Sequence, residues 1–238
     1  MEATETVMFT QNTLKFFDDI TANNNREWFT EHKQEYLDYV QAPTRALAAQ
    51  LEKDMRDFDP FMLTDPKRVC SRIYRDTRFS SDKSPYKTTS YLIYRRPMED
   101  KTNVPGWFFE VNATGYCYGM GAFNTNAKFM ANFRLLIEED PERFLSIIGN
   151  INRRRFDLYT DEYKRPIPND LDKKIQPYYQ SKNFYLICNK KIDKTLFSNR
   201  LAPTIVDGFM QLKLLYDFLW QTYSRSYTGK RQETRGNS

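Results

Sequence analysis

One stretch of the sequence, RIYRDTRFSSDKSPYKT at residues 72–88, combines basic side chains with aspartates and tyrosines. Its basic residues outnumber its acidic ones, so the segment carries a net positive charge. Guanidinium groups recognise phosphate and carboxylate through two parallel hydrogen bonds. We therefore predict a pocket for a small anionic ligand that bears one of these groups. The predicted ligand-binding residues are Arg26, Arg72, Arg75, Arg78, Lys83, Tyr86 and Lys87.

The three arginines of this stretch are spaced by three residues, whereas alternate residues share a face of a strand. They can converge only if the chain turns near Asp76, whose side chain favours an Asx turn. We expect Phe79 and Pro85 to stiffen the resulting loop. Arg26, in the first turn of a predicted helix, adds a cation where backbone N–H groups already favour anions.

The same residues permit a catalytic interpretation, in which the protein acts on a phosphorylated small molecule. Asp76 or Asp82 would serve as base or Mg²⁺ ligand and Tyr86 as acid, while the cations stabilise the transition state. The sequence contains no P-loop, H-E-x-x-H or G-x-S-x-G motif that would point to one reaction. Catalysis therefore stays undecided, no cofactor follows from the sequence, and no resident metal site is predicted.

A structural interpretation assigns the cations to the protein's own carboxylates. Asp76 and Asp82, with the acidic N-terminal arm, would form an internal ion-pair network. Residues 1–66 contain 6 basic and 13 acidic side chains, whereas residues 67–96 contain 9 and 2. This segregation either pairs the two segments inside the molecule or attracts an anion from outside.

A further alternative is a nucleic-acid-binding module. Tyr74, Tyr91 and Tyr94 would stack on bases beside the basic strands, and the arginines at 153–155 would extend the track. The sequence contains no recognised nucleic-acid-binding motif. The tyrosine-rich strands would equally suit a homodimer interface.

The elements that position these residues follow from apolar spacing and turn residues. In the run Asn23-Asn24-Asn25, Asn24 and Glu27 have the spacing of a capping box at the start of a helix. Gly119 and Gly121 lie on one face of a strand, where they leave an open groove or admit another backbone. Helices are predicted from Thr10, from Asn24, from Pro43, at 125–138, at 141–152 and from Pro203. Strands are predicted at 69–75, 88–96, 107–112, 116–123 and 184–188, and residues 156–183 are expected to be irregular.

Because the strands cluster between groups of helices, the order predicts an α+β fold with a mostly antiparallel sheet. N-terminal, middle and long C-terminal helices are expected to pack on this sheet. We predict a single domain over residues 1–225 and a disordered basic tail over 226–238.

The cysteines and the N-terminus bear on the location of the protein. Cys70, Cys117 and Cys188 form no C-x-x-C motif, which indicates buried free thiols in a reducing compartment. The first residues lack the pattern of a signal peptide, and no apolar run is long enough to span a membrane. We therefore predict a cytoplasmic protein with no membrane partner.

The motifs NNNREWF at 23–29 and SRIYRDTRFSSDKSPYKT at 71–88 resemble those of the domain of unknown function 2461 family. The stretch GWFFEVNATGYCYGMGAF and the predicted helix after it are similar to the middle portion of that family. The resemblance extends over most of residues 10–220. It implies the architecture of the family and a meeting of the two motifs in space, and it implies no substrate.

Overall fold

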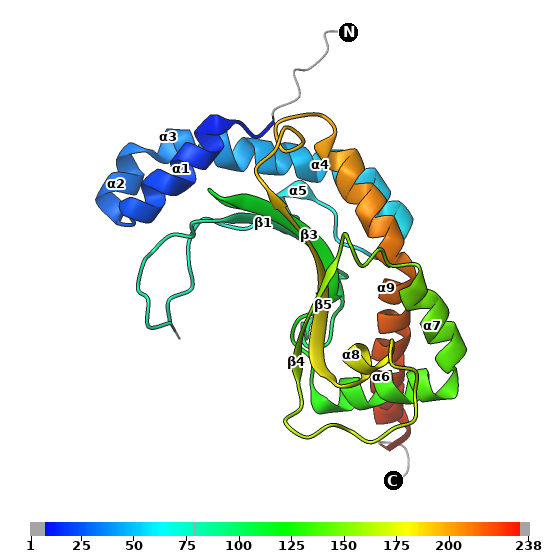
Figure 1. The fold of residues 1–238 in the computed structure, drawn as a ribbon. Helices are drawn as coiled ribbons and strands as arrows, with labels where there is room; N and C mark the ends of the chain where they lie inside the picture. Colours follow the sequence, from blue (N-terminus) through cyan, green and yellow to red (C-terminus); the bar gives the residue numbers. More distant parts are fainter. Residues whose placement is uncertain (1–7, 79, 234–238) are drawn as a thin grey trace. The chain divides into compact units, whose positions relative to one another are not determined.

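The computed structural model describes residues 8–78 and 80–233, with side chains described as far as Tyr227. Phe79, expected to stiffen the charged segment, lies outside the described residues. The fold is α+β, as predicted (Figure 1). Within the described ranges, no helix is long and apolar enough to cross a membrane.

The first part of the chain is helical up to residue 69, and the strands follow. The helices are α1 (Gln11–Ala22), α2 (Arg26–Glu31), α3 (Lys33–Tyr36), the π-helix η1 (Leu37–Gln41), α4 (Ala42–Phe58), α5 (Pro66–Val69), α6 (Ala127–Glu139), α7 (Pro141–Gly149), α8 (Gln176–Tyr179) and α9 (Leu201–Glu233). The strands are β1 (Ser90–Tyr94), β2 (Gly106–Val111), β3 (Gly115–Ala122), β4 (Asp157–Glu162) and β5 (Ser181–Lys191).

The strands form an antiparallel sheet in the order β1-β2-β3-β5-β4. The strands predicted at 107–112 and 116–123 are present as β2 and β3, which are neighbours in the sheet and form a hairpin. Its turn is held by Asn112, whose side-chain oxygen accepts hydrogen bonds from the backbone N–H groups of Thr114 and Gly115 at 2.8 and 3.0 Å. An Asx-type turn of this kind replaces backbone hydrogen bonds that the chain reversal would leave unmade.

The glycines of β3 were expected either to leave an open groove or to admit another backbone, and the surroundings of Gly121 decide between the two at that position. A Cβ atom on Gly121 would lie 2.6 Å from the backbone oxygen of Phe184 and 2.4 Å from the Cβ atom of Tyr185. Because such distances are shorter than van der Waals contact, glycine at this position admits the neighbouring strand and leaves no open groove there.

The chain forms two compact units. The first contains residues up to Tyr94, Phe108–Tyr118 and Asn189–Asp207, and the second contains Arg95–Trp107, Gly119–Cys188 and the chain from Gly208 onward. Strands β2, β3 and β5 and helix α9 contribute residues to both units. Neither unit is therefore a contiguous piece of chain, and the single domain over 1–225 stays a prediction. Helix α9 runs to Glu233 without a break at residue 225.

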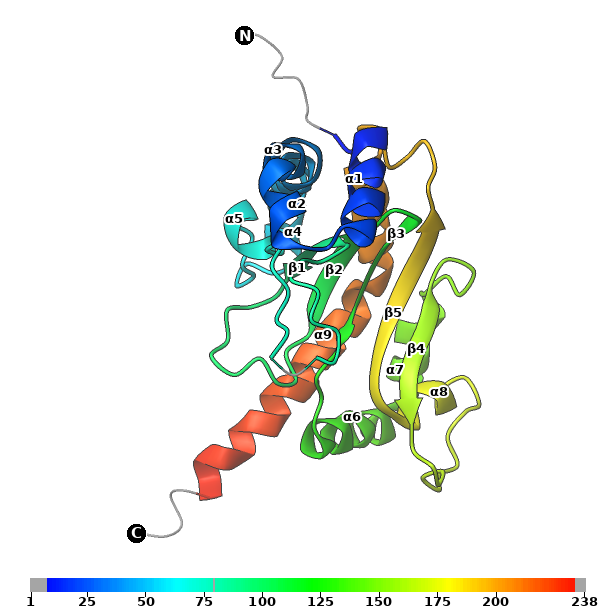
Figure 2. The ribbon, with the colours of Figure 1, turned by 90° about the vertical axis from the view of Figure 1, so that its left-hand side faces the viewer.

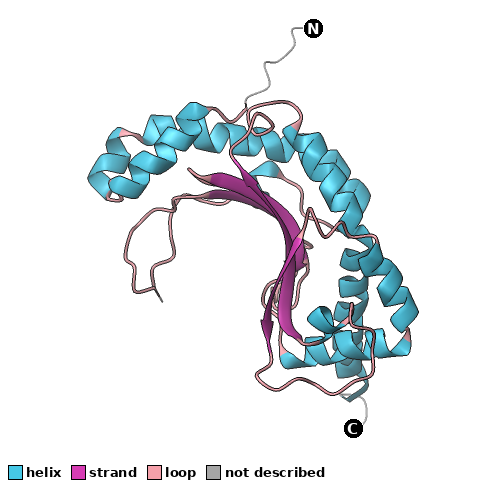
Figure 3. Cartoon of the chain, in the orientation of Figure 1, coloured by secondary structure: helices cyan, strands magenta, loops and turns pink. Residues whose placement is uncertain are grey.

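The first unit is built around aromatic and aliphatic side chains of its helices. Phe16 lies 5.9 Å from Tyr36 between ring centroids, and Phe9 stacks on Phe109 of β2 at the same distance. Helix α4 contacts β1 (Figure 3). The hydroxyl group of Tyr94 donates to the backbone oxygen of Ala48 at 3.3 Å. These contacts hold α3 and α4 in place, and these two helices carry Lys33 and Arg45 of the candidate site described below.

The second unit has an aromatic core between its helices and β5. Phe133 of α6 lies 5.2 Å from Phe184 of β5 and 5.6 Å from Phe144 of α7. Tyr178 of α8 contacts the same two phenylalanines. Helices α6 and α8 thus lie on one face of β4 and β5 (Figure 2).

Two of the sequence-based assignments are wrong, one of them in part. Residues 69–75 form no regular strand: α5 ends at Val69, and only single bridges join Cys70 to Leu92 and Tyr74 to Tyr86. Asp65 caps α5 and Pro66 occupies its first turn, and both favour a helix start over a strand.

Residues 156–183 are irregular only in part: they contain β4 and α8, and residues 163–175 between these two elements are irregular as predicted. Strand β4 is mostly polar, so its apolar pattern is weak, and pairing with β5 supplies the hydrogen bonds that define it. In this register Tyr159 lies opposite Tyr185.

Candidate functional site

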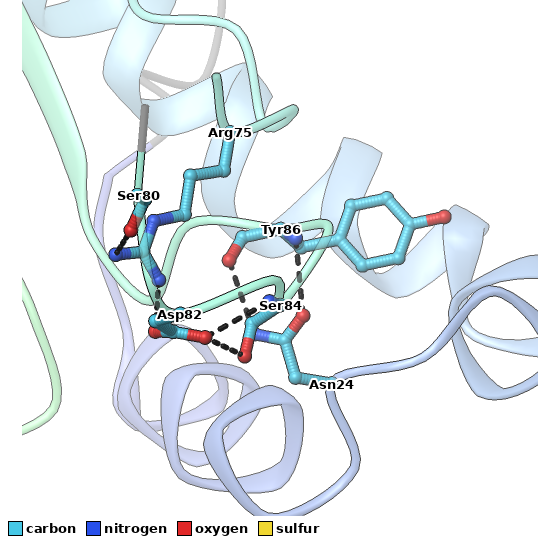
Figure 4. A network of polar contacts seen from close by, with 6 residues as sticks. All are labelled: Asn24, Arg75, Ser80, Asp82, Ser84 and Tyr86. Atoms are coloured by element: carbon cyan, nitrogen blue, oxygen red, sulfur yellow. Dashed lines mark hydrogen bonds and ion pairs between the residues drawn. The ribbon is translucent and has the colours of Figure 1, made fainter. Parts of the chain in front are cut away.

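The two sequence motifs meet, as the family resemblance implied. The side chain of Asn24 donates to the backbone oxygen of Tyr86 and accepts from its backbone N–H, both at 3.0 Å (Figure 4). The ring of Phe29 stacks on that of Tyr86 with centroids 4.2 Å apart. A helix start and an extended segment far apart in sequence are therefore joined by both polar and aromatic contacts.

Asn24 does not cap α2, which corrects the predicted capping box. The N-cap is Asn25, whose side-chain oxygen accepts from the backbone N–H of Trp28 at 2.9 Å. Two neighbouring asparagines therefore have different roles. Asn25 accepts a hydrogen bond at the start of α2, and Asn24 forms hydrogen bonds with the backbone N–H and C=O groups of Tyr86.

Residues 75–84, here called the charged loop, neutralise most of their own charge. Arg75 forms an ion pair with Asp82 and reaches the hydroxyl oxygen of Ser80 at 3.4 Å (Figure 4). Asp82 also accepts from the backbone N–H and the hydroxyl group of Ser84, at 2.9 and 2.7 Å. Arg78 forms an ion pair with Asp76 at 2.7 Å, and Lys83 donates to the backbone oxygen of Thr77 at 2.9 Å.

These contacts lower the pKa values of both aspartates. Hydrogen bonds from Arg78 lower the pKa of Asp76 to about 2. Hydrogen bonds from Ser84, followed by that from Arg75, lower the pKa of Asp82 further. Both carboxylates are therefore charged at neutral pH, and neither is poised to accept or donate a proton there.

Tyr86 and Lys87 follow the charged loop in the sequence, and both make contacts with other parts of the chain. The ammonium group of Lys87 donates to the backbone oxygens of Arg72 and Tyr74, the latter at 3.0 Å. Burial, followed by the charge of Arg72, lowers the pKa of Lys87. Tyr86 is buried, its ring points away from Asp82 and Ser84, and its pKa is raised chiefly by burial (Figure 4).

The predicted site residues do not line one cavity. A hollow of about 570 Å³ is lined by Arg75, Asp82, Tyr86 and Lys87, together with Thr21, Asn24, Ser84, Thr88 and Thr89. Arg72 lines a different hollow, of about 320 Å³. Arg26, Asp76, Arg78 and Lys83 are not among the residues that line either of these two.

The smaller hollow, here called the basic hollow, has a cationic rim and an apolar floor. Its exposed cations are Lys33, Arg45, Lys67 and Arg72. Its floor is formed by Phe29, Tyr36, Leu37, Cys70 and Ile73, with Gln41, Ser71 and Tyr74 completing the lining. No carboxylate is among these residues.

The cations of the basic hollow come from four separate elements. Lys33 begins α3, Arg45 lies in the first turns of α4, Lys67 lies in α5, and Arg72 follows in the extended segment. The π-helix η1 connects α3 to α4, and both of its end residues line the hollow. π-helical turns are frequent at functional sites because they re-aim side chains within an otherwise regular helix.

Within the described part of the chain, none of these four cations donates its side chain to an ion pair or a hydrogen bond. One of the four, Arg45, acts on titratable groups of the floor. Burial raises the pKa of the Cys70 thiol to about 11, and Arg45 opposes this shift. Burial likewise raises the pKa of Tyr36, again against the influence of Arg45.

Sequence reasoning missed Lys33, Arg45 and Lys67. A signal was present, because Lys33, Leu37, Gln41 and Arg45 recur at every fourth position and so share a helix face. Lys33 and Arg45 are isolated cations in the acidic arm, and Lys67 lies in the basic segment 67–96 but outside the charged motif at 72–88. Among the described residues, no cluster of three or more histidine, cysteine or acidic side chains could hold a metal ion.

A family model described as a conserved hypothetical protein matches residues 12–218, which is most of the chain. The chain belongs to the DUF2461 family. The match confirms the resemblance of the two motifs, and it also includes every residue that lines the basic hollow of this DUF2461 protein. The sequence has no match among curated proteins.

Proposed function

We propose that this DUF2461 protein binds a small ligand bearing a phosphate or carboxylate group in the basic hollow. One observation carries the proposal: four cations line a single hollow that no carboxylate lines, and within the described chain they form no ion pair. Like charges gathered in this way repel one another, and a bound anion relieves that repulsion.

The chemistry of the rim suits such an anion. Arg45 and Arg72 offer guanidinium forks that can each donate two parallel hydrogen bonds, and Lys33 and Lys67 add point charges. Because the four cations are exposed, salt should weaken the attraction. The proposed binding residues therefore retain Arg72 from the sequence-based set and add three cations to it.

The charged loop supports the structural interpretation for the other predicted cations. Arg75 and Arg78 each donate to an aspartate of the same loop, and Lys83 and Lys87 donate to backbone oxygens. A ligand at these cations would have to replace contacts that the chain already makes. We propose that this loop is scaffold and that its ion pairs fix its conformation.

Neither a catalytic role nor a nucleic-acid track gains support from the geometry. Asp76 and Asp82 carry lowered pKa values, and Tyr86 points away from Asp82. Of the proposed stacking residues, Tyr94 is fully buried, whereas Tyr74 is exposed and lines the basic hollow. We therefore propose binding and no reaction.

The thiols bear on the compartment that we propose. Cys70 is half-buried and Cys188 is buried, and both are free thiols. Free thiols persist in a reducing compartment, which supports the cytoplasm as the location of this protein.

A thermal-shift titration with inorganic phosphate tests the proposal on the wild-type chain, Arg72→Gln and Arg68→Gln. Arg68 is exposed, neighbours Lys67 in α5 and does not line the hollow, so it is a charge-matched control. A ligand that binds only the folded state raises the melting temperature. We expect a shift in the wild type and in Arg68→Gln and a much smaller one in Arg72→Gln. No shift in the wild type, or equal losses in both variants, would refute the proposal.

A further inference from the structure

We infer that the ligand of the basic hollow is a small aryl phosphate, with its ring on the apolar floor and its phosphate at the cationic rim. This inference rests on the proposed function and assigns a chemical class to the ligand. It follows from three features of the hollow: an apolar floor, a volume larger than an inorganic ion needs, and an exposed tyrosine at the edge.

The floor offers an apolar surface directly beside the cations. Phe29, Tyr36 and Ile73 form its base, with exposed fractions of 4, 6 and 7%. The rings of Phe29 and Tyr36 have centroids 5.7 Å apart and are tilted by 56°, so the base of the floor is aromatic. Such surfaces favour a flat apolar group over a hydrated ion.

The volume of the hollow points in the same direction. At about 320 Å³ it lies at the lower end of the range for small-molecule sites. An inorganic phosphate occupies only a few times the roughly 30 Å³ that one water molecule takes in the liquid, so most of the hollow would remain filled with water. A single ring attached to the phosphate replaces that water with apolar contact.

Tyr74 supplies the third feature. Its side chain is 62% exposed, although its backbone is held by the bridge to Tyr86 and by the hydrogen bond from Lys87. Its ring meets that of Phe29 edge-on, with centroids 6.5 Å apart and planes at 64°. A tyrosine with a fixed backbone and an open ring can cover a ligand ring that lies on Phe29.

Dianionic phosphate fits the rim better than carboxylate does. Four cations surround the hollow, and two of them are arginines that donate in pairs. A carboxylate carries one charge and would leave more of the repulsion between the cations in place. Benzoate is therefore a useful comparison for phenyl phosphate, because the two probes share the ring and differ in the anion.

The test uses Cys70 as a reporter of the floor and Cys117 as an internal control. Both thiols are half-buried, but Cys117 lines a separate hollow with Gly115 and Lys190. Iodoacetamide, a neutral reagent, is applied at pH 9 because the Cys70 thiol has a pKa of about 11. Mass spectrometry measures the two alkylation rates with phenyl phosphate, benzoate, phenol or inorganic phosphate present.

We expect saturating phenyl phosphate to slow alkylation of Cys70 at least fivefold and to leave Cys117 unchanged. Inorganic phosphate should raise the melting temperature and slow alkylation of Cys70 less than twofold, because it offsets the charge of Arg45 and leaves the floor uncovered. Benzoate and phenol should protect Cys70 weakly. Equal protection by phenyl phosphate and inorganic phosphate, or no protection by either when phosphate still stabilises the chain, would overturn the inference and leave the proposed function standing. If neither phosphate stabilises the chain, both fail.

Tyr74→Ala and Tyr74→Phe provide a second measurement by calorimetric titration. Tyr74→Ala should weaken phenyl phosphate binding about tenfold and leave inorganic phosphate binding unchanged, whereas Tyr74→Phe should retain both. An equal loss for the two ligands in Tyr74→Ala would contradict a role in covering the ring. Because Tyr74 is largely exposed, neither substitution is expected to prevent folding.

Discussion

The charged loop and the basic hollow are both rich in arginine and lysine, and they differ in where their counter-charges lie. In the loop, Arg78 reaches Asp76 two residues away, and Arg75 reaches Asp82 across a short turn. In the hollow, Lys33, Arg45, Lys67 and Arg72 share a lining without a carboxylate. The comparison shows that the density of charge along the sequence is a poor guide to charge available for a ligand.

The physical reason is the cost of leaving polar groups unmatched. A loop of alternating charges can satisfy itself locally, because an aspartate within a turn accepts from nearby backbone and side-chain donors. Cations that come from separate helices have no such neighbour. We propose that their repulsion stays in the folded chain until an anion binds, which would distinguish a binding site from a scaffold.

The largest expected effect is on ligand affinity, when two cations are removed from the basic hollow and, for comparison, two from the charged loop. Lys67→Gln with Arg72→Gln should weaken phenyl phosphate binding by about 30-fold, because two charge-assisted contacts at an exposed rim are lost. Arg75→Gln with Arg78→Gln removes the same charge from the loop and should change the affinity less than threefold. Calorimetric titration measures both, and a larger loss in the loop variant would reverse the assignment of the two regions.

The next largest effect is on stability, and it comes from the hydrogen bonds that join Asn24 to the backbone of Tyr86. Asn24→Ala removes two hydrogen bonds to the backbone of Tyr86, and we expect it to lower the free energy of unfolding by about 1.5 kcal/mol. Asn23→Ala is the control, since its side chain is exposed and bonds only within its own helix end. Urea unfolding compares the two variants, and equal losses would show that the joint between the motifs contributes little.

The ion pairs of the loop predict a change in a pKa. Arg78→Gln should raise the pKa of Asp76 from about 2 toward 3.8, whereas Arg72→Gln should leave it unchanged. Because the pKa is lowered in the folded chain, the pair stabilises the fold above about pH 3.8, and this contribution is lost as the pH falls to about 2. Carboxyl-carbon NMR titration measures the value, and an unshifted Asp76 in Arg78→Gln would exclude the pair in solution.

The smallest expected effect is on the alkylation rate of Cys70, which depends on the charge of Arg45 in the basic hollow. Arg45 holds the pKa of Cys70 below the value that burial alone would give. Arg45→Gln should therefore slow alkylation of Cys70 at pH 9, because less thiolate is present. Arg56→Gln, on the same helix but paired with Glu52, is the matched control. Faster alkylation in Arg45→Gln would show that access outweighs charge at this thiol.

Much of the fold could be predicted from local sequence signals. The apolar spacing of α1 and α4 and the turn between β2 and β3 are local patterns, and both led to correct elements. The meeting of the two motifs was implied by the family resemblance and is confirmed by Asn24 and Tyr86. Strand β4 was missed because its identity depends on pairing with β5, which no local pattern shows.

The candidate site was predicted only in part. Arg72 and the aromatic residue Tyr74 were singled out, but Lys33, Arg45 and Lys67 reach the hollow through the packing of three separate helices. Whether an arginine is paired depends on distances of a few ångströms, which sequence spacing does not fix. The loop aspartates were correctly named as an alternative destination for Arg75 and Arg78.

Arginine side-chain NMR tests the central claim most directly, because it reports each guanidinium group separately. The Nε–H signals of Arg72, Arg75 and Arg78 are followed while phenyl phosphate is added at low salt. We predict that the Arg72 signal moves with a saturable dependence and that those of Arg75 and Arg78 stay in place. Movement of the loop arginines with a stationary Arg72 would contradict the account.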